Sequence, residues 1–346
     1  MREIKYDKER RVNTLITALG VTMLTLLTLV SIAGAAPFAY VTNSFDGTVS
    51  VIDTATNNVT STMDVGLTPH GVAITPDRKK AYVANSDSGT VSVINITTND
   101  VIATVDVGVG PEGVAVTPDG KTVYVTNQFS NNVSIIDTAT NNVTWVDLGK
   151  QPPGAAVRAN IGKQPFGVAI TPDGKKAYVT NFGESSVSVI DTTNGTVIST
   201  IKVDMQPREV AITPDGTKAY VTNEFNNNVS VIDTATSNVT ATVEVGYEPY
   251  GVAVNPVNGT SVYVANRGEN PGTVSVIDTM SNNIIATVNL GEKQKPTGIA
   301  ITPDGTKAYV TNAYTNTVSV IDTATNSVTA TVDVGAGPHG VAITPV

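Results

Sequence analysis

The tetrapeptide Tyr-Val-Thr-Asn, or its variant Tyr-Val-Ala-Asn, occurs seven times in this chain and constrains its fold more than any other feature. The copies begin at Tyr40, Tyr82, Tyr124, Tyr178, Tyr220, Tyr263 and Tyr309, and successive copies lie 42 to 54 residues apart. Each repeat has four short β-type segments separated by turn-forming residues, such as GVAIT, AYVAN, TVSVIN and VIATVDVG in the second repeat. A period of this length with four strands per unit is typical of propeller blades.

The phase of the repeat predicts how the ring closes. After residue 36 the chain begins with a second-strand segment, FAYVTN, and it ends with a first-strand segment, GVAITPV. Seven segments of each type are present, so pairing the last with the first completes one blade from both ends. We therefore predict an all-β fold over residues 36–346, a seven-bladed β-propeller of four-stranded antiparallel blades. The first three segments of each repeat are nearly continuously apolar and predict strands buried on both faces, whereas the fourth alternates and predicts an exposed outer strand.

Residues 1–35 differ from the repeats. They begin with the charged stretch MREIKYDKERR, continue with an apolar run from Leu15 to Ala33, and end in small residues. This pattern is typical of a signal peptide cleaved near Ala35. The run is also nearly long enough to span a bilayer, so retention of residues 12–35 as a membrane anchor stays open. Either outcome predicts a propeller outside the cytoplasm, extracellular or at the cell surface.

Composition excludes several classes of function. The chain has 21 basic and 30 acidic residues, a net charge of −9, which disfavours nucleic acid as a partner. It has no cysteine, and therefore no disulfide or thiolate metal site. No H-E-x-x-H, G-x-S-x-G or phosphate-loop motif occurs. The aspartates of the TPDG segments lack the dense ligand spacing of a calcium loop and are interpreted as turn residues. We predict no metal and no cofactor.

The seven YVTN or YVAN segments, with their SVIDTATN and GVAITPDG partners, resemble the YVTN family of β-propeller repeat proteins over residues 37–346. That family is best known from archaeal cell-surface and surface-layer proteins. The resemblance implies a propeller at the cell surface. Because propellers host many functions, it does not by itself name an activity.

The positions that do not repeat indicate where a ligand would bind. Immediately before the glycine of each first strand, the residue changes from blade to blade, and these residues are expected to ring the mouth of the central channel: His70, Glu112, Phe166, Arg208, Tyr250, Thr297 and His339. His70 and His339 are the only histidines and belong to adjacent blades once the ring closes. Glu209 replaces the usual glycine and is interpreted as the partner of Arg208 in a rim ion pair. A binding rim and neutral variation of solvated loops both remain open.

Two further sequence features are a nearly duplicated segment and a set of possible glycosylation sites. The segment GKQPPGAAV at residues 149–157 nearly repeats as GKQPFGVAI at residues 162–170, which indicates either a tolerated loop insertion or a lid over the channel. Eight Asn-x-Ser/Thr sequences are possible glycosylation sites: Asn58, Asn95, Asn132, Asn142, Asn194, Asn228, Asn238 and Asn258.

These observations favour a non-enzymatic, surface-layer-like propeller that acts in adhesion or binds a cell-surface protein or glycan. The binding surface would be the variable face, which is the face of the disc that carries the non-repeating residues around the channel mouth. The alternative is an enzyme or redox protein, lactonase-like or haem- or metal-binding, that uses the two histidines at the channel mouth. It rests on the similarity of propeller lactonases and haem-binding propellers, and it requires acidic partners near the histidines, for which Glu112 is the obvious candidate.

Overall fold

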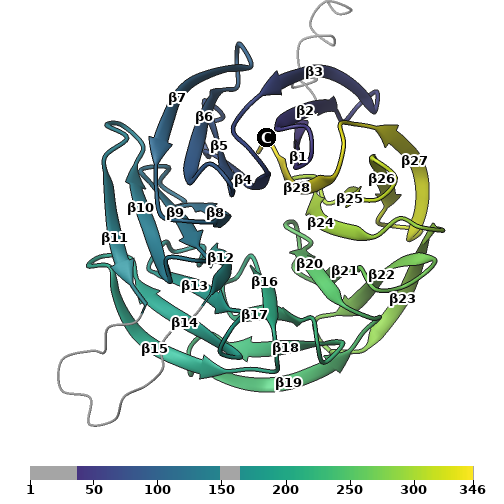
Figure 1. Ribbon diagram of the computed structural model, residues 1–346. Helices are drawn as coiled ribbons and strands as arrows, with labels where there is room; N and C mark the ends of the chain where they lie inside the picture. Colours follow the sequence, from purple (N-terminus) through teal and green to yellow (C-terminus); the bar gives the residue numbers. More distant parts are fainter. Residues whose placement is uncertain (1–36, 149–163, 346) are drawn as a thin grey trace, which may run out of the picture. The chain divides into compact units, whose positions relative to one another are not determined.

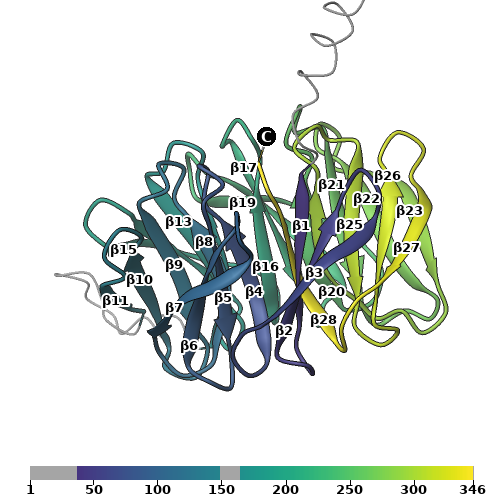
Figure 2. The same cartoon turned by 90° about the horizontal axis from the view of Figure 1, so that it is seen from above.

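The computed structural model describes residues 37–148 and 164–345, which form one compact unit (Figures 1 and 2). The predicted signal or anchor at residues 1–35 lies outside the described residues, as does most of the duplicated segment. Within the described part, no helix is long and apolar enough to cross a membrane.

Over these residues the chain forms seven four-stranded antiparallel sheets arranged around a central axis, which confirms the predicted propeller (Figure 1). The innermost strands are β4 (Pro69–Ile74), β8 (Pro111–Val116), β12 (Pro165–Ile170), β16 (Pro207–Ile212), β20 (Pro249–Val254), β24 (Pro296–Ile301) and β28 (Pro338–Ile343). The second strands are β1 (Phe38–Asn43), β5 (Lys80–Asn85), β9 (Thr122–Asn127), β13 (Lys176–Asn181), β17 (Lys218–Asn223), β21 (Ser261–Asn266) and β25 (Lys307–Asn312).

The outer half of each blade is built in the same way. The third strands are β2 (Thr48–Asp53), β6 (Thr90–Asn95), β10 (Asn132–Asp137), β14 (Ser186–Asp191), β18 (Asn228–Asp233), β22 (Gly272–Asp278) and β26 (Thr317–Asp322). The fourth strands are β3 (Asn58–Asp64), β7 (Asp100–Asp106), β11 (Val143–Asp147), β15 (Thr196–Lys202), β19 (Asn238–Glu244), β23 (Ile284–Gly291) and β27 (Ser327–Asp333).

The ring closes as the phase of the repeat predicts. The C-terminal strand β28 pairs antiparallel with β1, with Ala39 opposite Ile343 and Val41 opposite Val341. The resulting sheet has the order β28-β1-β2-β3, so its innermost strand comes from the far end of the chain.

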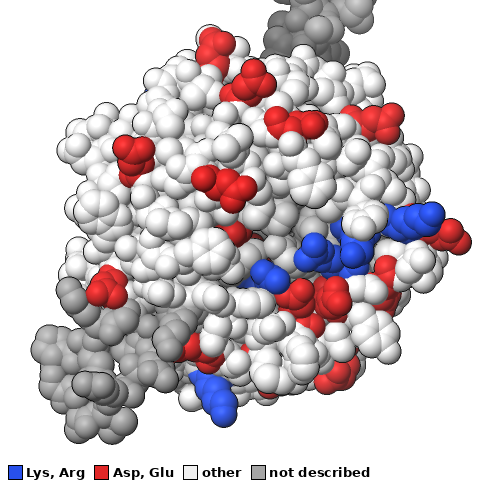
Figure 3. Space-filling view, viewed as in Figure 1, with Lys and Arg blue, Asp and Glu red and all other residues white. Residues whose placement is uncertain are grey.

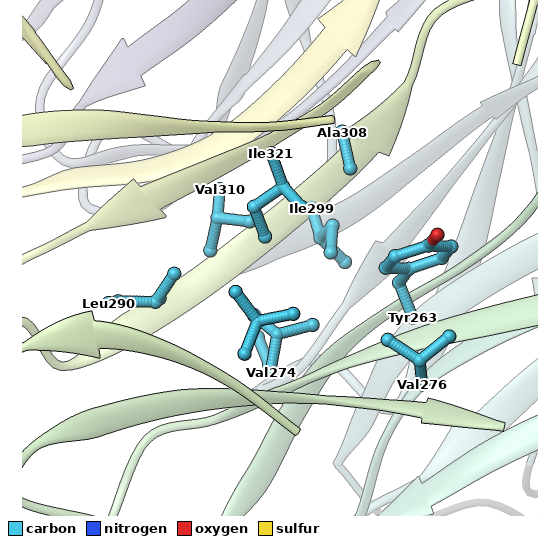
Figure 4. Close-up of a cluster of buried hydrophobic side chains, with 10 residues drawn as sticks. Tyr263, Val274, Val276, Leu290, Ile299, Ala308, Val310 and Ile321 are labelled. Carbon is cyan, nitrogen blue, oxygen red and sulfur yellow. The ribbon is translucent and has the colours of Figure 1, made fainter. Parts of the chain in front are cut away.

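The main hydrophobic core lies between blades. In the cluster shown in Figure 4, Tyr263 and Val276 from one blade pack with Ile299, Val310 and Ile321 of the next. The YVTN tyrosines are the largest fully buried side chains, each with 1% or less of its surface exposed. Apolar area removed from water is the dominant favourable term in folding, so each blade is stabilised by its neighbours.

The innermost strands depart from the prediction that they are buried on both faces. Most of their residues are only half-buried, in contrast to the second and third strands, because one side of each lines the channel. Their pairing with the second strands also shifts register near the start. In β4, for example, Pro69 pairs with Asn85 but Val72 pairs with Val83, which leaves His70 and Gly71 in a bulge.

A threonine hydroxyl accepts a backbone N–H at this bulge and also donates to a carbonyl of the neighbouring blade. In the sheet that contains β12, the hydroxyl of Thr180 accepts the Gly167 N–H at 2.8 Å and donates to the Arg208 carbonyl of the next blade at 2.6 Å. The same pair of bonds recurs at four other described junctions, where the donors to the next blade are Thr42, Thr126, Thr222 and Thr311. These are the threonines of the YVTN segments, so the repeat encodes the contact between blades.

We expect Thr222→Ala to lower the free energy of unfolding by about 1–3 kcal/mol, because it leaves the buried Tyr250 carbonyl and the Glu209 N–H without their hydroxyl partner. Denaturant unfolding measures the effect. The control is Thr242→Ala on the outer strand β19, where the side chain is exposed. Equal losses in the two variants would contradict the role of the threonine hydroxyl.

Candidate functional site at the channel mouth

The bulges at the start of the inner strands gather the predicted rim residues around one cavity of about 120 Å³. Seven of the eight line it: His70, Glu112, Phe166, Glu209, Tyr250, Thr297 and His339. Valine and isoleucine side chains two positions further along the strands also line it. Arg208, the eighth, lies above the cavity on the aromatic rings that surround its mouth.

His70 and Glu112 form the strongest polar contact of the cavity. The Nδ1 of His70 contacts the Glu112 carboxylate directly, although the two residues come from different blades. The other Glu112 oxygen accepts the Ser86 hydroxyl at 3.2 Å, and the glutamate is 5% exposed. An ionised carboxylate can only accept, so Nδ1 of His70 carries a proton in this contact, and in the neutral form of the ring Nε2 has the lone pair. Glu112 is thus the acidic partner that the alternative function requires.

The second histidine stacks on the first. The rings of His70 and His339 lie 4.1 Å apart with an interplanar angle of 12°. Burial holds the pKa of His339 well below its ordinary value, so this imidazole is neutral. Burial also raises the pKa of Tyr250 far above its ordinary value, so the tyrosine O–H donates to Nε2 of His339 at 2.9 Å.

Arg208 does not pair with Glu209, and the predicted rim ion pair is wrong. Arg208 Nε instead contacts the Glu224 carboxylate, and its guanidinium lies 4.6 Å from the centre of the Phe166 ring and 4.2 Å from that of Phe182. Consecutive side chains on an extended strand point in different directions, so Arg208 and Glu209 diverge.

Glu209 instead turns into the cavity, where a glycine makes room for it. A Cβ added to Gly167 would lie only 2.7 Å from Glu209 Oε2, so the carboxyl group occupies the space that a side chain on the neighbouring strand would fill. Burial, and secondarily the charge of Glu112, raises the pKa of Glu209 to about 8. At neutral pH the site therefore holds a protonated carboxylic acid below the His70–Glu112 pair.

The rim includes side chains besides the eight predicted site residues. Arg267 lies 5.3 Å from the centre of the Tyr250 ring, and its Nε is buried without a hydrogen-bond partner among the described residues. Arg267, Phe182 and Glu224 each directly follow a YVTN or YVAN segment, at a position where the residue changes from blade to blade, and this variation is the signal in the sequence that identifies them. Thr297, by contrast, is 1% exposed and its hydroxyl bonds to Thr311 at 2.9 Å, which is a packing role.

The face around the mouth is unevenly charged (Figure 3). Acidic side chains are scattered over it, whereas most basic side chains gather on the side of blades β16–β19, β20–β23 and β24–β27, where several acidic side chains lie directly beside them. Arg208, Arg267, Lys293 and Lys295 belong to the segments of these blades on this face. Over the described residues, no group of three or more His, Asp or Glu side chains could hold a metal ion.

The possible glycosylation sites divide by exposure. Five are exposed: Asn58, Asn142, Asn194, Asn238 and Asn258. Asn95 and Asn132 are half-buried. Asn228 is 5% exposed and its amide donates to Asp204 at 2.8 Å, so its amide nitrogen is poorly placed for modification. Glycosylation at the other sites stays a prediction.

A family model described as "Lactonase, 7-bladed beta-propeller" matches residues 38–256 and 168–344. No curated protein sequence matches the chain.

Several solved structures share the fold. The hydrazine synthase of Kuenenia stuttgartiensis is 25% identical, with a TM-score of 0.69 over 79% of this chain and 88% of that one. A candidate 6-phosphogluconolactonase from Bacteroides uniformis is 16% identical, with a TM-score of 0.73 over 90% of this chain and 100% of that one. The dihydro-heme d1 dehydrogenase NirN is also 16% identical, with a TM-score of 0.66 over 90% of this chain and 76% of that one. At 16% identity the likeness shows the fold alone.

The protonated state of Glu209 predicts a specific pH dependence of stability. Between its ordinary pKa near 4.5 and the value of about 8, the native state holds a proton that the unfolded state has lost. The unfolding free energy therefore falls as pH rises through this range and levels off above pH 8. We expect Glu209→Gln to remove a slope of up to about 1.4 kcal/mol per pH unit, measured by denaturant unfolding at several pH values. Parallel curves for the two proteins would contradict the assignment.

Proposed function

The chain belongs to the lactonase family of seven-bladed β-propellers, and from this premise we propose that it hydrolyses a small cyclic ester at the channel mouth. The observation that carries the proposal is the contact between His70 and Glu112 inside a cavity that also holds the protonated Glu209. The family membership corrects the expectation of a non-enzymatic adhesion protein, and with it the prediction that the chain is not an enzyme.

The His70–Glu112 pair supplies a general base. Glu112 holds the Nδ1–H of His70, so the Nε2 lone pair is available to take a proton from water. The water oxygen then attacks the ester carbonyl carbon. Stacking against His339 fixes the plane of the His70 ring, and neutral His339 adds no positive charge beside it. A base held in one orientation reacts more readily than a mobile one.

Two arginines interact with the carbonyl oxygen of the ester, and Glu209 interacts with its ring oxygen. The Nε of Arg267, which is buried and has no hydrogen-bond partner among the described residues, and the guanidinium of Arg208 stabilise the negative charge that develops on the carbonyl oxygen. When the ring C–O bond breaks, the leaving oxygen takes a proton from Glu209. The product is the open hydroxy acid, and the proton abstracted by His70 is returned through solvent to restore Glu209.

The size and charge of the site indicate the substrate. A cavity of about 120 Å³ is smaller than the roughly 300–1,000 Å³ typical of pockets for drug-sized ligands, so it accepts the reacting ring alone. The rest of a larger substrate would lie on the face beside Arg208, Lys293 and Lys295. An acidic substituent, a phosphate or a carboxylate, suits that basic surface.

The haem half of the alternative fits this cavity less well. A tetrapyrrole is larger than the space, and the ring nitrogens that face the protein already bind Glu112 and Tyr250.

The proposal extends to the location of the enzyme. The charged and apolar composition of residues 1–35 supports secretion or anchoring at the cell surface, and the YVTN repeats support a place among cell-surface propellers within the family. Binding of a cell-surface protein or glycan by the variable face stays a prediction.

The test is hydrolysis of δ-gluconolactone and of its 6-phosphate by the full chain, followed by NMR. We expect His70→Asn to lower kcat by about 100-fold or more, since general base catalysis contributes 10²–10⁴-fold. The phosphorylated lactone should be preferred in kcat/KM by about tenfold.

The matched control is Glu244→Gln, a change of an exposed residue at the end of β19 that leaves the channel untouched. It should retain the wild-type rates. Hydrolysis no faster than the uncatalysed reaction, or unchanged kcat in the His70 variant, would overturn the proposal.

A further inference from the structure

On the face opposite the channel mouth, a lysine repeatedly bridges two blades. It begins the second strand of a blade, and its ammonium group donates to a backbone carbonyl in the third-to-fourth-strand turn of the next blade. The pairs are Lys80 with Thr138 at 2.6 Å, Lys176 with Thr234 at 2.9 Å, Lys218 with Thr279 at 2.5 Å and Lys307 with Thr54 at 2.6 Å. At these four junctions, the groove between blades therefore holds the ammonium group of a lysine side chain.

Three of the seven junctions lack the lysine, with Phe38, Thr122 and Ser261 at its position. Between the blades β8–β11 and β12–β15, Thr122 stands where the lysine would begin the second strand, and the corresponding carbonyl is that of Thr192. In the part of the chain that the structure describes, no lysine or tyrosine donates to this carbonyl. At another junction without lysine, where Ser261 holds the position, the hydroxyl of Tyr263 reaches the matching Thr323 carbonyl at 3.4 Å.

The missing side chain leaves space. The groove that contains Lys176 has a volume of about 210 Å³, and its walls include Asp173, Asp215 and Thr234. The groove at Thr122 has matching walls, Asp119, Asp173 and Thr192, but its volume is about 420 Å³ and the ring of Tyr124 joins its lining. The lysine position is therefore vacated while the acceptors around it are kept.

The walls suit a cation on an apolar stem. Hydrogen bonds from Thr117 and Thr171 to Asp119 and Asp173 hold the pKa of both carboxyl groups below the ordinary value, so they are ionised. Their exposed contacts with Lys121 and Lys175, at 3.8 and 3.9 Å, are weak. The exposed ring of Pro118, which also lines the groove, offers an apolar surface on which an alkyl stem packs.

We propose that this groove is a binding site for a free linear alkylammonium ion, such as a short diamine, which takes the place of the missing lysine. Its ammonium group donates to the Thr192 carbonyl and lies near the two aspartates, and its methylene chain packs along Thr122 and Pro118. The site is separate from the channel mouth and independent of the proposed hydrolysis.

The test is calorimetric titration of the full chain with n-butylammonium chloride, with tetramethylammonium chloride as the reference. The quaternary ion has the same charge but no N–H to donate. We expect saturable binding of one n-butylammonium ion per chain. In Thr122→Lys the new side chain occupies the groove, and affinity should fall by about tenfold or more.

The reverse substitution, in the neighbouring groove, provides a second test. Lys176→Thr opens the neighbouring groove and should add a second n-butylammonium site, while thermal unfolding of this variant shifts upward when the amine is added. Thr122→Lys copies a residue found at four equivalent positions, so it is expected to fold, which circular dichroism checks. No saturable binding beyond that of tetramethylammonium, or equal affinity in Thr122→Lys, would overturn the proposal.

Discussion

The hydroxyl of the YVTN threonine is the contact on which the functional site depends. It accepts the N–H of the bulged residue in its own blade and donates to the carbonyl of a rim residue in the next. His70, Phe166, Arg208, Tyr250 and His339 are all held in this way, so their backbone positions follow from the blade before them. A repeated residue thereby places side chains that never repeat. Fold and site are linked through one buried threonine in each of five blades.

The glycines next to these rim residues set the size of the cavity. A Cβ at Gly71 would lie 2.3 Å from the Glu112 carbonyl, so the inner strands approach too closely for a side chain there. Glu209 is the exception, and its carboxyl group uses the space above Gly167. Buried beside the Glu112 charge, it keeps a proton at neutral pH. One departure from the repeat therefore brings an acid to a site that already has a base.

Much of the fold could be predicted from the sequence, because strand order and ring closure follow from a repeat whose phase is visible. The rim positions were also predictable, since position in the repeat fixes position around the axis. Side-chain directions were not: sequence adjacency suggested an Arg208–Glu209 pair, whereas the bulged strand sends Arg208 to Glu224 and Glu209 into the cavity. The function was misjudged for a related reason. No linear motif marks a site whose histidine and glutamate come from separate blades.

The central claim is that a lactone ring is opened at the channel mouth. A crystal structure with δ-valerolactam, an analogue that resists hydrolysis, tests this most directly. We expect the lactam ring to lie inside the cavity, with its carbonyl carbon facing Nε2 of His70 and its carbonyl oxygen toward Arg267 or Arg208. A lactam bound only elsewhere on the disc, with the cavity unchanged, would contradict it.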